Sequence, residues 1–224
     1  GEVGRARGPG ATHEGRIVAA VLDAVAGAGG GPSAASLVVS SSMPIRDLDA
    51  FGHPRPEPVS VYANRGASGI DGVVSTAFGI ASQSDAPTVC VIGDVAFFHD
   101  QNGLLWAREQ DARVVFVLVD NDGGGIFHAL PIAEHEPDFT AYFATPHGLD
   151  LARAAALHGL EVADVQIPEL RGALQAAIGG GRTAILRVKT ERTANRRRHA
   201  EITAAVARGV RDALTAQPRE THTR

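Results

Sequence analysis

Cysteine is almost absent from the chain, and this limits its covalent chemistry. Of the 224 residues only Cys90 is a cysteine, and it lies in an apolar stretch that predicts a buried strand. A single cysteine cannot form an internal disulfide, so the sequence favours a protein of the reducing cytoplasm. Long apolar runs are also missing, since none approaches the roughly 20 residues that span a bilayer. We therefore expect a cytoplasmic protein without a membrane span.

The chain also lacks an excess of basic charge. Its 21 Lys and Arg residues are outnumbered by 25 Asp and Glu residues, and the net charge of −4 argues against nucleic acid as the main partner. A chain of this length can bury the core of one α/β domain. Residues 1–12 begin with Gly-Glu-Val-Gly and are interpreted as an interdomain linker or a remnant of an expression vector. The domain itself is expected over residues 13–224.

Short apolar runs alternate with helical patterns along the chain. Continuous β-rich runs, typical of buried parallel strands, occupy residues 36–40, 59–63, 88–92, 114–119, 160–165 and 182–188. Helices are predicted over residues 13–28, 73–82, 98–110, 149–158 and 168–178 and from 193 onward, whereas 130–148 is interpreted as an irregular segment or short helices. The alternation predicts an α/β fold with a mostly parallel sheet and helices on both faces.

Polar or glycine-rich loops follow four of the predicted strands, after Ser40, Ala63, Ile92 and Val119. Open α/β sheets bind ligands at the carboxyl edge of their strands. If the sheet is parallel, all four loops lie at that edge. We therefore expect them to converge on one binding site.

Two of these loops carry Asp94 and Asn121, which are 27 residues apart. Asp94 offers a carboxylate oxygen and Asn121 an amide oxygen, and glycine's backbone freedom lets Gly123 turn its carbonyl inward. Three protein oxygens leave three octahedral positions for phosphate and water, a division typical of Mg²⁺. The neighbouring glycines let backbone amides approach a phosphate. Turn chemistry at two strand ends is an alternative interpretation of the same residues.

This pair of loops resembles the thiamine-diphosphate motif, in which a Gly-Asp is followed one crossover later by an Asn. Here Val95 and Asp120 replace the usual glycine and asparagine beside Asp94 and Asn121. Residues 64–72, Asn-Arg-Gly-Ala-Ser-Gly-Ile-Asp-Gly, are similar to one family of these enzymes, the 2-succinyl-5-enolpyruvyl-6-hydroxy-3-cyclohexene-1-carboxylate synthases of menaquinone biosynthesis. Two further segments also look like this family: residues 124–131, with Gly-Gly-Ile-Phe and Leu-Pro, and residues 42–47. The resemblance covers roughly residues 13–210.

The resemblance implies a thiamine-diphosphate-binding fold and a transferase activity. Such a carboligase decarboxylates 2-oxoglutarate on thiamine diphosphate, held by Mg²⁺ or Mn²⁺, and adds the succinyl-semialdehyde unit to isochorismate. The implied metal ligands are Asp94, Asn121 and the Gly123 carbonyl. The implied cofactor contacts are Gly66, Ala67, Ile70, Gly93, Val95, Ala96, Ile126, Phe127 and Leu130.

Within this set, the resemblance makes Ile70 the apolar wedge that bends the cofactor. Ile126, Phe127 and Leu130 are implied to line its thiazolium side. Ser42, Arg46 and Arg65 are implied to reach the substrate or an intermediate. Both substrates carry carboxylates, which arginine binds through two charge-assisted hydrogen bonds.

The chain resembles only the last of the three domains in this family. There the first domain binds the aminopyrimidine and supplies a catalytic glutamate, and the active site forms with the first domain of another subunit. Glu109 and Glu134 lie in the wrong context to be that glutamate. The expected partner is therefore a pyrimidine-binding domain of a second subunit, within a homodimer or homotetramer. On its own the chain is expected to be inactive.

Three alternatives to this function remain open. The first is the diphosphate-binding subunit of a two-subunit thiamine-diphosphate 2-oxoacid decarboxylase. The second is a different carboligase of the same superfamily. The third is a non-catalytic nucleotide-binding module, because a glycine-rich turn between a strand and a helix is by itself a weak signal.

Two expectations concern burial. Asp94 is expected in a loop outside the core, so that its replacement would leave the fold intact. A group of arginines at the start of the predicted terminal helix is interpreted as a solvated helix face. Its members are Arg192, Arg196, Arg197 and Arg198.

Overall fold

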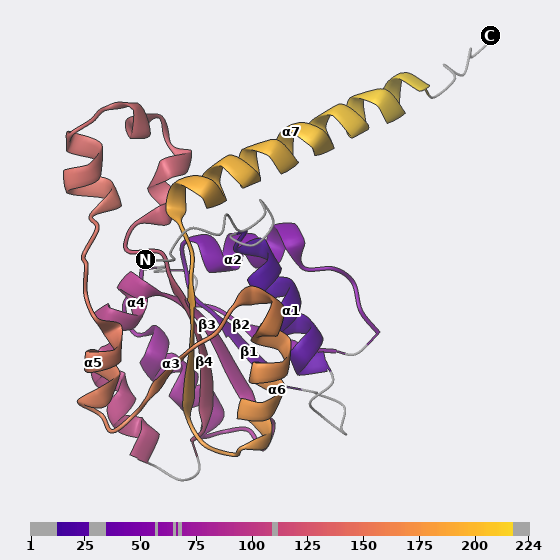
Figure 1. The fold of residues 1–224 in the computed structure, drawn as a ribbon. Coiled ribbons are helices and arrows are strands. Elements are labelled where there is room, and N and C mark those ends of the chain that lie inside the picture. Colours follow the sequence, from indigo (N-terminus) through magenta and orange to yellow (C-terminus); the bar gives the residue numbers. More distant parts are fainter. Residues whose placement is uncertain are drawn as a thin grey trace, which may run out of the picture.

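Six parallel strands form a single sheet in the order β2-β1-β3-β4-β6-β5 (Figure 1). The computed structural model describes residues 13–26, 35–56, 58–64, 66, 69–108 and 112–216, so the predicted linker over residues 1–12 lies outside the described residues. The strands are β1 (Ser36–Val39), β2 (Ser60–Tyr62), β3 (Thr88–Gly93), β4 (Val114–Asp120), β5 (Val162–Asp164) and β6 (Ala184–Lys189). The predicted parallel α/β fold is confirmed.

Helices connect the strands. The α-helices are α1 (Gly15–Ala26), α2 (Met43–Phe51), α3 (Val73–Ala81), α4 (Asp94–His99), α5 (Leu151–Ala156), α6 (Leu170–Gly179) and α7 (Arg192–Ala216). Short 3₁₀ segments are η1 (Gln101–Arg108), η2 (Gly125–Ala129), η3 (Pro131–Glu134) and η5 (Ile167–Glu169), and η4 (Thr140–Ala144) is a π turn. The region predicted as irregular or as short helices, residues 130–148, contains η3 and η4.

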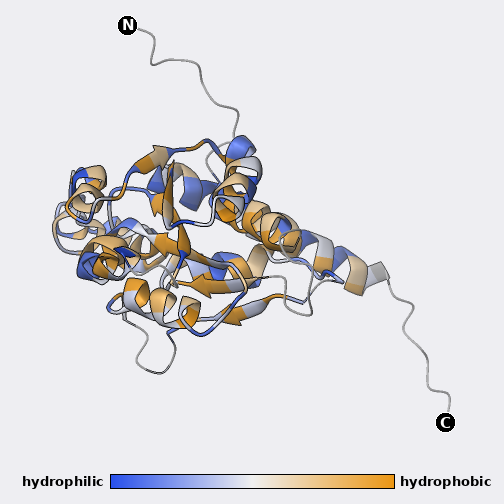
Figure 2. Cartoon of the chain, turned by 90° about the horizontal axis from the view of Figure 1, so that it is seen from below, coloured by the Kyte–Doolittle hydropathy of each residue, from blue (hydrophilic) through white to orange (hydrophobic). Residues whose placement is uncertain are grey.

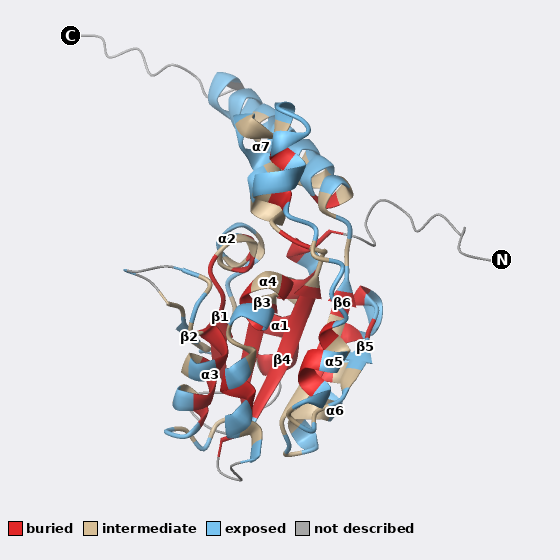
Figure 3. Ribbon diagram, turned by 90° about the vertical axis from the view of Figure 1, so that its left-hand side faces the viewer, coloured by how far each residue is buried: buried red, intermediate tan, exposed pale blue. Residues whose placement is uncertain are grey.

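The strands are apolar throughout because helices cover both faces of the sheet. In β3, Val89 and Val91 belong to one buried cluster with α1 and α6, while Cys90 and Ile92 belong to another with α3, α4, η1 and α5. Successive side chains of a strand point to opposite faces, so a doubly covered strand must be continuously hydrophobic. The central strands are accordingly drawn mainly in hydrophobic colours in Figure 2 and as buried in Figure 3.

The predicted crossover helix over residues 98–110 is wrong in its limits. The α-helix α4 begins at Asp94, directly after β3, and ends at His99, and the 3₁₀ segment η1 follows it. Asp100 marks the break because its carboxylate accepts hydrogen bonds from the backbone N–H of Ser75, at 2.8 Å, and from its hydroxyl, at 3.2 Å. The contact fixes the crossover against the start of α3.

The last helix, α7, extends away from the sheet (Figure 1) and is mostly exposed (Figure 3). Within the described part of the chain, its first turns pack against the rest of the protein, where Asn195 is buried and His199 lies 3.2 Å from Asp47 Oδ1. Among the described residues, no helix combines the length and the apolar character needed to cross a membrane.

Candidate cofactor and metal site

A pocket of about 530 Å³ lies at the carboxyl edge of the sheet. The loops after β1, β3 and β4 form most of it, and the segment before α3 closes one side. These strands and β2 are neighbours in the sheet, so their carboxyl ends are adjacent. The expected convergence of these loops is confirmed for the part of each that the structure describes.

Most of the predicted site residues meet in this pocket. Those on its lining are Ser42, Arg46, Ile70, Gly93, Asp94, Val95, Ala96, Asn121, Gly123, Ile126 and Phe127. Leu130 and Gly66 are not part of the described lining. Leu130 lies between η2 and η3 with an extended backbone, and 48% of its surface is exposed to solvent. Arg65 and Ala67 lie outside the described residues.

Asp94 is buried, with only 2% of its surface exposed, and it is the first residue of α4. The expectation of a loop position outside the core is therefore wrong. Its Oδ1 accepts the N–H of Val95 at 2.7 Å, and its Oδ2 accepts the N–H groups of Asn121 at 3.1 Å and of Gly123 at 3.0 Å. Hydrogen bonds to a charged acceptor are stronger than neutral ones. This carboxylate therefore holds the two motif loops together.

Asn121 presents a buried oxygen with no hydrogen-bond partner among the described residues. Its Nδ2 donates to Glu14 Oε1 at 3.0 Å, which leaves Oδ1 as the free end of an amide that lines the pocket. A buried polar atom without a partner costs about 1–3 kcal/mol, and a ligand that this oxygen could coordinate would remove that cost. The orientation fits the amide-oxygen ligand that the sequence predicts.

Glu14 belongs to the same site, although the sequence analysis did not identify it. It is 2% exposed, and burial raises its pKa to about 7, an effect opposed by the hydrogen bonds from Thr190 and Asn121. The Thr190 hydroxyl donates to Glu14 Oε1 at 2.6 Å. No spacing pattern marks this glutamate, because its partners come from the loops after β4 and β6.

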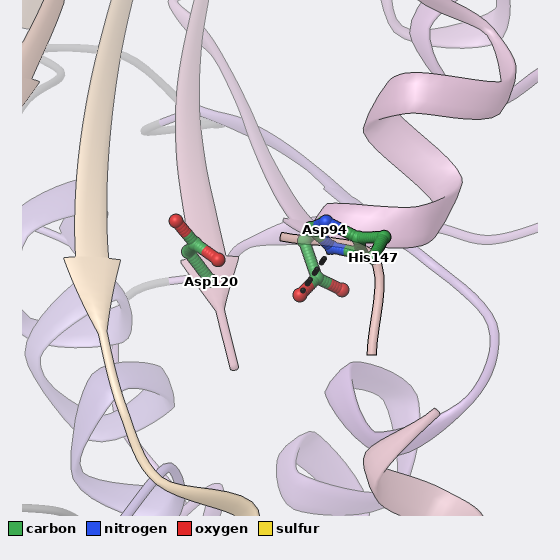
Figure 4. Close-up of side chains that lie close together, drawn as sticks. All are labelled: Asp94, Asp120 and His147. Atoms are coloured by element: carbon green, nitrogen blue, oxygen red, sulfur yellow. Dashed lines mark ion pairs between the residues drawn. The ribbon is translucent and has the colours of Figure 1, made fainter. Parts of the chain in front are cut away.

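His147 is a second residue that the sequence analysis missed. Its Nε2 lies 3.3 Å from Asp94 Oδ2, and Asp94, Asp120 and His147 bring possible ligand atoms within 4.8 Å of one another (Figure 4). The N–H of Leu149 donates to His147 Nδ1 at 3.0 Å, so the proton of a neutral ring is on Nε2, facing Asp94. Burial, with the nearby charge of Asp94, raises the pKa of Asp120.

The family of the chain follows from comparison with known proteins. The family model described as "Thiamine pyrophosphate enzyme, C-terminal TPP binding domain" matches residues 49–188, more than half of the chain. The chain belongs to this family. The matched range contains β2 to β5, all of β6 but its last residue, and both loops of the Asp94–Asn121 motif.

Individual relatives of this thiamine pyrophosphate (TPP, or thiamine diphosphate) domain are synthases. The chain is 49% identical over 181 residues to the 2-succinyl-5-enolpyruvyl-6-hydroxy-3-cyclohexene-1-carboxylate synthase of Roseiflexus castenholzii and 47% identical over 190 residues to that of Halobacterium salinarum. These alignments cover 80% and 84% of the chain but 31% and 32% of the relatives. The chain thus spans about a third of the length of the curated relatives it matches, and the predicted resemblance to the synthases is confirmed.

Solved structures share the fold of this TPP domain. The benzoylformate decarboxylase of Polynucleobacter necessarius superposes with a TM-score of 0.61 at 20% identity, over 83% of this chain and 33% of that one. The thiamine diphosphate-dependent 4-hydroxybenzoylformate decarboxylase of Rhodococcus jostii RHA1 superposes with a TM-score of 0.62 at 21% identity. This superposition covers 85% of this chain and 35% of that one. At such identities the likeness establishes the fold alone.

Arg192 supports the Asn121 loop of the TPP domain from the start of α7. Its Nη1 donates to the carbonyl oxygen of Asn121 at 2.7 Å and also to that of Asp122, and its side chain is only 18% exposed. Arg196 Nε donates to the His128 carbonyl at 3.2 Å. The interpretation of this arginine group as a solvated helix face is therefore wrong for Arg192.

Arg46 lies on the first turn of α2, at the wall of the pocket and exposed to solvent. Its Nη1 donates to the Ser42 carbonyl at 2.7 Å, so the side chain folds back toward the loop after β1. Ser42 has a φ of 72°, an uncommon value for a residue other than glycine. Both predicted substrate-contacting residues described by the structure thus stand together at one side of the pocket.

Gly123 provides a test of the loop geometry. Its φ is +132°, and a Cβ built on it would lie 2.2 Å from the Ala144 carbonyl oxygen. Gly123→Ala should therefore lower the free energy of unfolding by about 1–3 kcal/mol from backbone strain alone, and also weaken cofactor binding. Urea denaturation and cofactor titration measure the two effects.

A matched control for Gly123→Ala is Gly79→Ala. Gly79 lies in α3, where no atom within 4 Å would meet the new Cβ. There the change should stabilise the domain by about 0.5–1 kcal/mol, because alanine is the better helix former. Equal effects of the two substitutions would contradict the assigned conformation of Gly123.

Proposed function

We propose that this chain is the cofactor-binding domain of a 2-succinyl-5-enolpyruvyl-6-hydroxy-3-cyclohexene-1-carboxylate synthase. This carboligase of menaquinone biosynthesis would decarboxylate 2-oxoglutarate and add the succinyl-semialdehyde unit to isochorismate. One observation carries the proposal: a single pocket joins the Asp94–Asn121 motif of the cofactor to residues of the synthase-like segments, Ser42, Arg46 and Ile70. The relatives at 45–49% identity that bear the synthase name support it.

The residues of the pocket fit Mg²⁺ or Mn²⁺ with a diphosphate. Asp94, the unpartnered Oδ1 of Asn121 and the carbonyl of Gly123 would hold the ion, and oxygen donors are the ligands that hard cations prefer. The Gly123 carbonyl accepts the N–H of Gly125 at 2.9 Å and retains a second lone pair. Thiamine diphosphate, when bound, supplies the stabilisation of a carbanion that protein side chains cannot provide.

The other side chains of the pocket divide into an apolar and a polar wall. Ile70, Ile126 and Phe127 are proposed to hold the cofactor rings and to exclude water. Ser42 and Arg46 are proposed to bind substrate carboxylates at the opposite side, where a guanidinium group can donate two parallel hydrogen bonds. Gly93, Val95 and Ala96 are proposed to approach the diphosphate through their backbone, since they begin α4 at the pocket.

The proposed partner is a pyrimidine-binding domain of a second subunit, in a cytoplasmic homo-oligomer without a nucleic-acid ligand. Glu14 is the only glutamate on the described lining, and Asn121 and Thr190 occupy its Oε1. A glutamate that activates the cofactor would therefore come from the partner. Phe127 is 36% exposed and Leu130 48% exposed near the pocket, which supports an apolar surface for such a domain.

A titration separates this function from a nucleotide-binding module. Thiamine diphosphate should bind to the full-length protein only when Mg²⁺ is present, and ATP should not compete. Metal-independent binding or displacement by ATP would overturn the proposal. The two-subunit decarboxylase gains no support from the two decarboxylases named above, because at 20% and 21% identity their structures establish the fold alone. A panel of 2-oxoacids would test for a different carboligase.

Arg46→Ala in the full-length protein should reduce turnover far more than cofactor affinity. The reason is that its guanidinium group is proposed to bind a substrate carboxylate, and its hydrogen bond in the structure is with the Ser42 carbonyl and not with the metal ligands. Arg46→Lys should restore activity only in part, since lysine lacks the two-pronged geometry. The measurements are kcat, KM for 2-oxoglutarate and the Kd of thiamine diphosphate.

The control for Arg46 is Arg208→Ala, on the exposed part of α7 away from the pocket. This change removes the same charge and should leave all three constants unchanged. If Arg46→Ala weakens cofactor binding as strongly as turnover, Arg46 contacts the diphosphate and not the substrate.

A further inference from the structure

Glu14 sits at the centre of a buried network that joins four segments of the chain. Its Oε1 accepts Asn121 Nδ2 at 3.0 Å and the Thr190 hydroxyl at 2.6 Å. Its backbone N–H donates to Asn195 Oδ1 at 3.0 Å. Glu14 precedes α1, Asn121 follows β4, Thr190 follows β6 and Asn195 belongs to α7. One carboxylate oxygen is therefore held by two donors, and the backbone of the same residue is anchored to α7.

The hydrogen bond to this carboxylate fixes which end of the Asn121 amide lies against Glu14 and which end is left free. A side-chain amide has a donor end and an acceptor end that differ little in shape. With Nδ2 toward Glu14, the amide donates a hydrogen bond to a carboxylate oxygen, and Oδ1 is left buried without a partner among the described residues. In the reversed orientation two oxygens would face each other at about 3 Å, and the amide would present N–H groups to the pocket. Those groups cannot bind a cation.

We propose that Glu14 is a positioning residue that fixes the Asn121 amide so that its oxygen faces the metal. The proposal rests on the function proposed above and extends it to a residue that does not itself touch the ion. Partners behind a ligand commonly orient it in this way, and their loss lowers metal affinity. The role needs a hydrogen-bond acceptor at position 14, not a negative charge. Glutamine at this position should therefore keep the role, because it has a side-chain acceptor, whereas leucine should lose it.

The test compares Glu14→Leu with Glu14→Gln in the full-length protein. Mn²⁺ binding is measured by electron paramagnetic resonance in the presence of thiamine diphosphate. Glu14→Leu should weaken Mn²⁺ about 10- to 100-fold, because the amide loses its orientation. Glu14→Gln should stay close to wild type, since its side-chain oxygen can accept from both Asn121 and Thr190. Turnover is not needed for this measurement.

Thr190→Val is the matched control. It removes the other hydrogen bond to Glu14 Oε1 but leaves the contact with Asn121 intact. If Glu14 only stabilises the fold, Thr190→Val and Glu14→Leu should lower Mn²⁺ affinity in proportion to their loss of stability, as measured by urea denaturation. If Glu14 instead positions Asn121, Thr190→Val should keep Mn²⁺ affinity near that of the wild type, even where it lowers stability as much as Glu14→Leu or more.

A second measurement keeps the proposal testable if Glu14→Leu does not fold. In wild-type protein, the Asn121 side-chain amide should give a ¹H–¹⁵N signal with one proton protected from exchange. Glu14→Gln should retain this protection. Rapid exchange of both protons in the wild type would overturn the proposal.

Two results separate this inference from the proposed function. If the wild type binds Mn²⁺ with thiamine diphosphate but Glu14→Leu binds it equally well, the role of Glu14 is wrong while the function stands. If the wild type shows no metal-dependent binding, the proposed function fails, and the role of Glu14 fails with it.

Discussion

Asp94→Ala is expected to abolish metal-dependent cofactor binding and to destabilise the domain as well. The carboxylate accepts three backbone N–H groups, from Val95, Asn121 and Gly123, and it is buried. Without it these donors lose their acceptor, at a cost on the order of 3 kcal/mol in the free energy of unfolding. The loss of a charged oxygen ligand removes the metal in addition.

Asp94→Asn separates the two effects. The remaining amide oxygen can still accept from Asn121 and Gly123, so most of the stability should persist. The negative charge is lost, and metal-dependent binding of thiamine diphosphate should fall nearly as far as in Asp94→Ala. Urea denaturation gives the stability, and calorimetric titration with and without Mg²⁺ gives the binding. Undiminished binding in Asp94→Asn would show that the Asp94 charge does not contribute to holding the metal.

The second large effect concerns turnover. Residues 1–224 alone should show no carboligase activity, whereas the full-length protein should have the activity proposed above. Of the described lining residues only Glu14 is a glutamate, and its Oε1 accepts from Asn121 and Thr190 beside the proposed metal ligands, so we assign it no role on the pyrimidine side of the cofactor. Contacts with the diphosphate bind the ground state and the transition state about equally and therefore do not accelerate the reaction.

The assay follows the loss of isochorismate absorbance with 2-oxoglutarate, Mg²⁺ and thiamine diphosphate. It should be repeated after addition of the separately expressed pyrimidine-binding domain, which is expected to restore activity. The Asp94→Asn chain with the same domain is the control and should remain inactive. Robust turnover by residues 1–224 alone would disprove the need for a partner domain.

The apolar runs of the sequence predict the sheet correctly, because a strand covered by helices on both faces needs hydrophobic side chains at every position. Every side chain of β3 and β4 up to the last residue is buried, so the runs Thr88–Ile92 and Val114–Val119 are continuous and easily recognised. Parallel connections then place all carboxyl ends at one edge. The pocket follows from this arrangement, and so does the meeting of Asp94, Asn121 and Ser42 on its wall.

The limits of the crossover helix did not follow from the sequence. Residues 94–110 contain both apolar and polar groups at helical spacing, and propensity alone permits one helix. The break after His99 depends on Asp100, whose carboxylate is hydrogen-bonded to Ser75 of α3. The end of the helix thus depends on a contact with another helix, which local helix propensity cannot predict.

The sequence by itself determined the parallel α/β fold and the edge of the sheet at which the Asp94 and Asn121 loops meet, because strand burial and glycine-rich loops leave repeated local patterns. Only the tertiary structure decided the surroundings of that motif. Glu14, His147 and Arg192 come from segments far from Asn121 or Asp94, yet each contacts one of these residues. Such contacts involve single polar side chains without periodicity. Their partners exist only once the sheet has brought β3, β4, β6 and α7 together, so sequence spacing cannot reveal them.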